Sequence, residues 1–342
     1  MAHEKKVVET PVEYDPQYIL QVKDLKKHFP IKGGMISKTV GHVKAVDGVT
    51  FNLKRGTTMG LVGESGCGKT TTGRTILRLA GEKTGGQVLF NGKDVYALSD
   101  KEMRDMRTKM QIIFQDPFSS LQPRMPVGEI IGEAVREHGL VSKEEFDDYI
   151  DQVMDNCGLQ PFHKDRYPHE FSGGMRQRVI IALATFMGPR VVLADEPTTA
   201  LDVVVQRGIL MMLMHLQKQL KNTMVIVSHD MGVHYQITDR MAIMYSGSVI
   251  ELGKTEDIFN DPIHPYTQML VAALPRVGDK SSRVGIPGRP PALASPPPGC
   301  RFAPRCPHAT DRCRSEVPAF REVKPGRFAA CHLLNEEVEK HG

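Results

Sequence analysis

One stretch of this sequence has the residue types and the spacing to bind phosphate. Residues 63–71 read GESGCGKTT and match the pattern G-x-x-x-x-G-K-[ST]. A short apolar run before them predicts a buried strand, and residues 72–79 after them predict a helix. A glycine loop between a strand and a helix directs backbone N–H groups, and the positive end of the helix dipole, at a phosphate. We expect Lys69 to contact the β- and γ-phosphates of a nucleoside triphosphate and the Thr70 hydroxyl to bind Mg²⁺.

Two carboxylates and a histidine follow later apolar runs. Asp195 and Glu196 end one such run, and His229 comes shortly after the next. Because the carboxyl ends of parallel strands meet at one edge of a sheet, we expect these side chains to lie near Thr70. Asp195 can hold Mg²⁺ through water there, and Glu196 can polarise an attacking water. Together these residues predict hydrolysis of the bound nucleotide.

The elements that must position these residues alternate along the chain. Helical spacing dominates residues 119–184 and returns in residues 206–220, whereas the glycine-containing residues 31–41 are expected to form a loop. This alternation predicts an α/β fold with a largely parallel sheet and an inserted helical subdomain over residues 119–184. The apolar runs that predict strands are residues 18–22, 43–53, 58–62, 88–92, 110–114, 191–196, 224–227, 241–245 and 248–251.

The composition changes beyond residue 253, where prolines become frequent and four of the six cysteines lie. In a reducing compartment such a group predicts a metal site rather than disulfides. Four thiolates suit Zn²⁺ or an iron–sulfur cluster, the spacing lacks C-x₂-C pairs, and free thiols are a third possibility. We expect the metal to hold together a segment with little core of its own, apart from the phosphate loop. The candidate ligands are Cys300, Cys306, Cys313 and Cys331.

Bulk composition narrows the class of protein. The 342 residues are 40% hydrophobic and 25% charged, which is ordinary for a globular protein, and the net charge of +4 argues little for nucleic acid. Residues 1–11 are charged and lack the apolar core of a signal peptide. No apolar run approaches the ~18 residues of a spanning helix. We expect a soluble, cytosolic protein with one large domain and an appendage.

Six motifs in order resemble those of the ABC-transporter ATPases. They are the phosphate loop, Gln115, residues 171–177, the Asp195–Glu196 pair, residues 199–202 and His229. The match covers residues 17–256 and implies a P-loop NTPase fold of the ABC type. The resemblance implies that Glu196 is the general base and that His229 holds the γ-phosphate and the attacking water. It implies that two such domains bind ATP between them, because the signature faces away from its own phosphate loop.

The resemblance also assigns the remaining contacts. Gln115 is implied to touch Mg²⁺ with Thr70 and Asp195, and Phe29 to stack on adenine, although a core role for Phe29 is as consistent with its type. Ser172, Gly173 and Gly174 open a predicted helix and would close over the γ-phosphate bound to the opposite subunit. The implied nucleotide contacts are Phe29, Gly63, Glu64, Ser65, Gly66, Cys67, Gly68, Lys69, Thr70, Thr71, Gln115, Ser172, Gly173, Gly174, Asp195 and Asp202.

A narrower resemblance is to the ATPases of oligopeptide/dipeptide importers, most like the second (F-type) subunit. Residues 115–125, the His-Pro-Tyr at 264–266 and residues 285–307 carry it, while Met175 is more like the partner subunit. It implies that residues 257–342 form a C-terminal extension with a [4Fe–4S] cluster. The implied partners are a paralogous ATPase, two membrane permeases docked on residues 116–132, and an external peptide-binding protein, at the cytoplasmic face of the inner membrane.

Two kinds of alternative remain. Relatives of this family also move oligosaccharides, nickel chelates or antimicrobial peptides, and the permease and the binding protein choose the cargo. A non-transport ABC ATPase of DNA repair would need a long coiled coil between phosphate loop and signature, and the sequence shows no sustained heptads there. A translation-factor ATPase would need two motif sets, and one is present.

Overall fold

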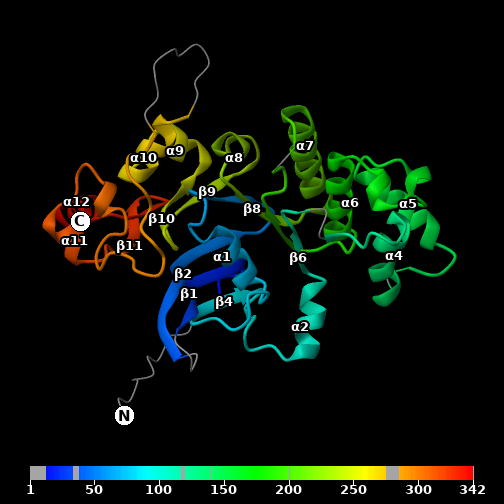
Figure 1. The fold of residues 1–342 in the computed structure, drawn as a ribbon, viewed down its shortest axis with the longest axis horizontal. Helices are drawn as coiled ribbons and strands as arrows, with labels where there is room; N and C mark the ends of the chain where they lie inside the picture. Colours follow the sequence, from blue (N-terminus) through cyan, green and yellow to red (C-terminus); the bar gives the residue numbers. More distant parts are fainter. Residues whose placement is uncertain are drawn as a thin grey trace.

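A computed structural model describes residues 13–33, 38–116, 120–139, 141–199, 201–274 and 285–341. The chain forms an elongated molecule (Figure 1). A group of helices drawn in green lies at one end of its long axis, and the C-terminal segment drawn in orange and red lies at the other. Within the described part of the chain, no helix is long and apolar enough to cross a bilayer.

The main sheet carries the predicted strands at its centre. Its order over the described residues is β11-β12-β10-β9-β3-β8-β7-β6, and β6, β7, β8, β3 and β9 run parallel. All residues of β3, β7 and β8 are buried, as expected for a parallel sheet covered on both faces. The bounds are β3 (Thr58–Val62), β6 (Met110–Ile113), β7 (Val191–Asp195), β8 (Thr223–Ser228), β9 (Arg240–Tyr245), β10 (Ser248–Lys254), β11 (Phe320–Lys324) and β12 (Arg327–Ala330).

A second, antiparallel sheet has the order β2-β1-β4-β5. Its strands are β1 (Tyr18–Gly33), β2 (Lys38–Lys54), β4 (Gly85–Phe90) and β5 (Lys93–Asp94). The predicted loop at residues 31–41 was wrong where the structure describes it. Ile31 pairs with Gly41 and Gly33 with Lys38, so the two long strands continue as a hairpin whose backbone groups bond each other. Residues 34–37 lie outside the described residues.

Helices α1, α4, α5, α6 and α7 fall where the sequence predicted helix, whereas α2 and α8 were not predicted. In the inserted block the apolar face of α5 is buried through Ile150, Val153 and Met154. Burial raises the pKa of the Cys157 thiol, just past that helix, to about 12. The helices up to β9 are α1 (Lys69–Ile76), α2 (Asp100–Arg107), α4 (Val127–Glu137), α5 (Phe146–Asn156), α6 (Gly173–Thr185), α7 (Val203–Leu220) and α8 (Met231–Ile237).

The C-terminal extension shares its apolar core with the main sheet and adds strands to that sheet. Strand β12 pairs with β10 at the sheet edge. Phe302 is buried against Tyr245 and Tyr266, with ring centroids 5.3 Å and 5.4 Å away. The segment was expected to have little core of its own, and these contacts show that it packs on the core of the main domain. Its helices are α9 (Thr255–Asn260), α10 (Pro265–Ala272), the 3₁₀ turn η3 (Ala303–Arg305), α11 (Asp311–Ser315) and α12 (His332–His341).

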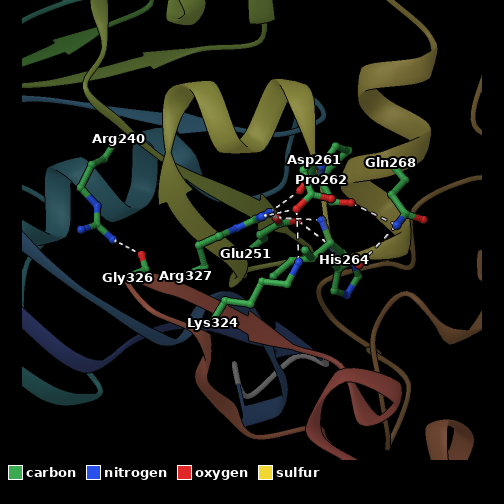
Figure 2. Close-up of polar contacts among 10 residues, drawn as sticks. Arg240, Glu251, Asp261, Pro262, His264, Gln268, Lys324, Gly326 and Arg327 are labelled. Atoms are coloured by element: carbon green, nitrogen blue, oxygen red, sulfur yellow. Dashed lines mark hydrogen bonds and ion pairs between the residues drawn. The ribbon is translucent and has the colours of Figure 1, made fainter. Parts of the chain in front are cut away.

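An ion-pair network also fixes the extension to the core (Figure 2). Arg327 of β12 reaches the buried Glu251 of β10 at 3.3 Å and Asp261, after α9, at 2.8 Å. Glu251 also accepts backbone N–H bonds from Ile263 and His264 at 3.1 Å and 2.9 Å. A buried carboxylate with a charged partner and backbone donors is satisfied, so this network orients the β11–β12 hairpin on the core.

Candidate active site

A cavity of about 370 Å³ lies at the carboxyl edge of the parallel strands. Segments far apart in the sequence line it, as expected if the parallel strands deliver their ends to one place. The predicted residues among its lining come from the phosphate loop and from the segments that follow β6, β7 and β8. The lining residues are Ala45, Ser65, Gly66, Gly68, Lys69, Thr70, Thr71, Gln115, Glu196, His229 and Leu293.

Gly68 makes the turn from the phosphate loop into α1. It is the residue before the helix and has φ of +102°, a conformation that favours glycine. A Cβ there would lie 2.1 Å from the carbonyl oxygen of Ala45. The loop therefore needs glycine at this position for its backbone angle and for its close approach to β2, and the first N–H groups of α1 remain directed at the cavity.

Lys69 is held inside the loop. Its side chain is buried, and Nζ donates to the carbonyl oxygens of Gly63 at 2.8 Å and Glu64 at 3.1 Å. It also lies 3.9 Å from Cys67 Sγ, and since these hydrogen-bond partners are neutral, an anion in the cavity can supply the opposite charge. This is the position that the sequence predicted for a lysine that contacts phosphate.

Thr70 and Asp195 form the candidate magnesium site. The Thr70 hydroxyl donates to Oδ1 of Asp195 at 2.8 Å. Asp195 is fully buried, and burial raises the pKa of its carboxyl above the ordinary value. Its Oδ2 has no hydrogen-bond partner among the described residues. A buried carboxylate oxygen without a donor, beside a hydroxyl, fits the oxygen ligands that Mg²⁺ prefers.

Glu196 is the centre of the polar contacts at this edge. Its Oε2 accepts from Gln115 Nε2 at 3.1 Å and from the Thr199 hydroxyl at 2.8 Å, and Oε1 lies 3.3 Å from Nδ1 of His229. Its backbone has φ of +48°, uncommon for a residue with a side chain. The carboxylate is held facing the cavity by three elements, where it can accept a proton from water.

Several residues that the resemblance implies do not line this cavity. Ser172 caps α6 by accepting from the Met175 N–H at 3.3 Å, and Gly173 and Gly174 begin that helix. Asp202 caps α7 by accepting from the Val205 N–H at 2.9 Å. If a second subunit completes the site, these residues would contact the nucleotide of the partner, and they would not be expected to line the cavity of their own chain. Residue 200 of the same motif lies outside the described residues.

Four other implied contacts are placed elsewhere. Phe29 is 39% exposed on β1, so the alternative core role does not describe it, and Lys27 Nζ lies 5.0 Å from its ring centroid. Glu64 does not line the cavity and makes an ion pair, and Cys67 is buried, with a pKa that burial raises. Gly63 packs against β9, where a Cβ would lie 2.2 Å from the carbonyl oxygen of Met244.

Sequence reasoning missed Ala45 and Leu293. Both are apolar, neither has a residue type that suggests chemistry, and 248 positions separate them in the sequence, from 45 to 293. The structure joins their segments, because the Lys44 N–H donates to the carbonyl oxygen of Leu293 at 2.9 Å. The C-terminal extension therefore forms part of the cavity wall, contrary to the expectation that it lies apart from the phosphate loop.

The tail cysteines do not form the predicted metal site in this structure. No three Cys, His, Asp or Glu side chains among the described residues, which include all four cysteines, are placed to hold a metal ion. Burial and the charges of Cys313 and Cys331 raise the pKa of Cys300 to about 11, so these sulfurs lie within electrostatic reach. The Cys300 N–H donates to the Cys313 carbonyl oxygen at 2.8 Å. Neither the zinc site nor the iron–sulfur cluster is supported by this arrangement.

Comparison with known proteins extends these observations to the whole chain. The family described as ABC transporter matches residues 46–199, and the family described as oligopeptide/dipeptide transporter, C-terminal region, matches residues 250–313. Among solved structures, cbiO1 of Clostridium perfringens, part of an ABC transporter complex, matches with a TM-score of 0.62 at 28% identity, over 72% of this chain and 92% of that one. A dimeric ATP-binding cassette, MJ0796 bound to ADP and Pi, matches with a TM-score of 0.61 at 28% identity, over 69% and 98%.

Curated relatives match over nearly the full length. The oligopeptide transport ATP-binding protein AppF of Bacillus subtilis is 44% identical over 322 residues, which are 93% of this chain and 98% of that protein. A putative peptide import ATP-binding protein of Brucella ovis is 44% identical over 92% of this chain and 97% of that protein. This similarity and the cavity confirm the resemblance, and the chain belongs to the ATP-hydrolysing subunits of ABC transporters that carry the oligopeptide/dipeptide transporter C-terminal region.

Proposed function

We propose that this chain hydrolyses ATP to power the import of peptides through a membrane transporter. One observation carries the proposal: the same chain contains the ATP-site cavity and the peptide-transporter C-terminal region. The phosphate loop, Gln115, Glu196 and His229 line that cavity. The names of its full-length relatives, peptide and oligopeptide ATP-binding proteins, support the cargo. We retain residues 17–256 as the proposed nucleotide-binding domain, with its helical subdomain at about 119–184, and residues 257–342 as the extension.

The proposed chemistry assigns a task to each group in the cavity. Lys69 and the loop N–H groups bind the triphosphate, and Thr70, Asp195 and Gln115 hold Mg²⁺, which neutralises charge on the phosphates. Glu196 takes the proton of the attacking water, and His229 orients that water and the γ-phosphate. Phe29 is the proposed adenine contact. It lies on β1, opposite Val43 of the neighbouring strand β2, and β2 also carries Ala45, which lines the cavity.

A second ATPase subunit completes the proposed site. Ser172, Gly173 and Gly174 lie at the N-terminus of α6 in this chain but not at its own cavity, so they are free to face a nucleotide on a partner. Asp202 begins the next helix on the same side. We propose a heterodimer with a paralogous ATPase, and on this basis the isolated chain hydrolyses ATP slowly.

The permeases are proposed to dock where the sheet meets the helical subdomain. A groove of about 430 Å³ there is lined by residues of β6, by Ile180 and Leu183 of α6, and by Phe114, which follows β6 and is 38% exposed. The proposed docking segment, residues 116–132, begins beside this groove, and its residues 117–119 lie outside the described part of the chain. Such docking would place the chain at the cytoplasmic face of the inner membrane as a peripheral subunit.

The [4Fe–4S] cluster is a separate proposal, made from the four cysteines in the sequence of the extension. Its ligands would be Cys300, Cys306, Cys313 and Cys331. Four thiolates can hold such a cluster, and ligation would draw the sulfurs together as they lose their protons. Iron and sulfide near four of each in anaerobically purified chain would support it. One zinc per chain would favour the zinc site, and neither metal would leave free thiols.

Reconstitution tests the proposed function. The chain is assembled in proteoliposomes with its permeases, the paralogous ATPase and the external binding protein, and labelled di- to hexapeptides are supplied with ATP. We expect peptide uptake that needs ATP, and ATPase activity well above that of the isolated chain. Uptake of an oligosaccharide, a nickel chelate or an antimicrobial peptide instead would replace the cargo but keep the ATPase role. High ATPase activity of the dilute chain alone would contradict the composite site.

A further inference from the structure

The C-terminal extension makes an ion pair with the phosphate loop. Arg305, in the turn η3 of the extension, places Nη1 2.8 Å from Oε2 of Glu64 and Nη2 3.0 Å from Oε1. The contact joins residues 241 positions apart, and it is bidentate, the strongest geometry for such a pair. The Arg305 side chain is 4% exposed and that of Glu64 is 26% exposed. This pair is therefore largely shielded from solvent.

The rest of the Arg305 guanidinium is satisfied as well. Nε donates to the carbonyl oxygen of Pro287 at 2.8 Å, Nη2 to that of Ile286 at 3.2 Å, and Nη1 to the hydroxyl of Tyr245 at 3.2 Å. The bonds to Glu64 raise the pKa of Arg305 above its ordinary value. A guanidinium held on every side cannot leave Glu64 without breaking several bonds, so its positive charge is fixed at the loop.

Glu64 lies where a negative charge opposes ATP binding. It is the second residue of the phosphate loop, and its carbonyl oxygen accepts from Lys69 Nζ at 3.1 Å. The charge of its carboxylate acts within the loop, since it adds to the effect of burial in raising the pKa of Cys67, one residue before Gly68. An unpaired carboxylate on the phosphate loop would repel the triphosphate, and the partial burial of Glu64 would reduce the screening of that repulsion by solvent and salt.

We propose that Arg305 is a positioning residue of the ATP site, which acts through Glu64 by cancelling its charge, so that tight ATP binding depends on the C-terminal extension. Leu293 belongs to the same extension and lines the cavity. It is a second and independent contact between the extension and the ATP site. The inference rests on the ATP site of the proposed function but not on its cargo.

Binding of Mg-ATP to the full chain, measured by isothermal titration calorimetry at low salt, tests this proposal. In Arg305→Gln the Glu64 charge is left unpaired, and we expect the dissociation constant to rise roughly five- to ten-fold. The dissociation constant of Arg305→Lys should lie between those of the unsubstituted chain and Arg305→Gln, because an ammonium keeps the charge but not the bidentate contact. The decisive variant is the double substitution of Glu64→Gln with Arg305→Gln, which removes both charges. It should bind Mg-ATP within about two-fold of the unsubstituted chain.

A matched control separates charge from anchoring. Arg327→Gln breaks another buried arginine contact of the extension, with Glu251 and Asp261, which do not line the cavity (Figure 2), and it should lower the thermal midpoint without changing the dissociation constant. In the assembled transporter, Arg305→Gln should raise KM for ATP and leave kcat nearly unchanged.

Three results would overturn the proposal. An unchanged dissociation constant in Arg305→Gln would do so, and so would a double variant as weak as that single variant, since Arg305 would then only hold the extension in place. If Arg305→Gln does not fold, Glu64→Gln gives the third measurement. It leaves an extra positive charge at the loop and should bind Mg-ATP at least about two-fold more tightly at low salt, with weaker binding as the contradicting result. Failure of peptide uptake would not affect any of these measurements.

Discussion

Glu196 combines two properties that a general base needs. It is held by Gln115, Thr199 and His229, so its carboxylate has one orientation, and its side chain is 16% exposed, so solvent still reaches it. Asp195, the preceding residue, is fully buried against Thr70. Two neighbouring carboxylates thus have separate environments, one suited to a metal ion and the other to proton transfer.

Replacing Glu196 separates binding from hydrolysis. In Glu196→Gln the amide keeps hydrogen-bond partners but cannot accept a proton, and the phosphate loop is unchanged. We expect Mg-ATP binding within about two-fold and hydrolysis by the assembled transporter slower by ~10²–10⁴. Glu82→Gln, at a side chain that is 77% exposed, is the control. Near-normal turnover by Glu196→Gln would remove Glu196 from its proposed role.

At the scale of elements, the spacing between β3 and α8 keeps the phosphate loop and His229 together. Gly60 lies in the middle of β3, and His234 of α8 packs directly on it. A Cβ on Gly60 would lie 2.4 Å from Nδ1 of His234. His234 is fully buried and its Nε2 lies 3.2 Å from the carbonyl oxygen of Ser228, the residue before His229. The missing side chain at position 60 therefore sets how closely the two elements approach.

Two glycine-to-alanine substitutions test this close packing. Gly60→Ala should lower the free energy of unfolding by ~1–3 kcal/mol, because α8 must move or His234 must change its rotamer. Gly208→Ala, within α7, is the control. Its new Cβ meets only Arg178 Nη2 at 3.6 Å, so the better helix propensity of alanine should stabilise the chain by up to ~1 kcal/mol. Urea unfolding measures both, and equal effects at the two sites would contradict the packing argument.

At the scale of the molecule, the core and the extension share one sheet and one buried network. Among its buried side chains are His234, under the ATP site, and His264, at the start of α10. Burial lowers the pKa of each from 6.5 to about 4. His264 also accepts the Tyr266 N–H at Nδ1, at 3.0 Å, a bond that protonation would remove.

These histidines predict a loss of stability in acid. Between pH 6.5 and 4 the unfolded chain binds protons that the folded chain excludes, so stability is complete above pH 6.5 and falls as the pH drops. The slope is about 1.4 kcal/mol per pH unit for each histidine. His264→Asn keeps a side chain that can cap α10 and removes one titrating group. Urea unfolding between pH 7.5 and 5 should have a shallower pH dependence in this variant, and an unchanged slope would refute the contribution of His264.

Features that depend on neighbouring residues along the chain could be predicted from the sequence. The pattern of residues 63–71, the apolar strands and the carboxylates at their ends predicted the α/β fold, and the structure places Lys69, Thr70, Glu196 and His229 at one cavity. Parallel strands make this possible, because the end of each apolar run must arrive at the same sheet edge. The long β1–β2 hairpin was not predicted, since its glycines signal a turn unless a partner strand bonds them.

Tertiary structure alone decided how the C-terminal extension meets the ATP site. Arg305 and Leu293 stand among prolines and cysteines, and no local pattern links them to Glu64 or to Ala45. Their roles arise because β12 adds to the sheet edge and Phe302 packs on Tyr245, which turns the extension toward the phosphate loop. The cysteine spacing predicted a separate tail held together by a metal, and it could not show that the tail packs on the rest of the chain. Spacing carries no information about the surface on which a segment packs, and here that surface is the ATP-binding core.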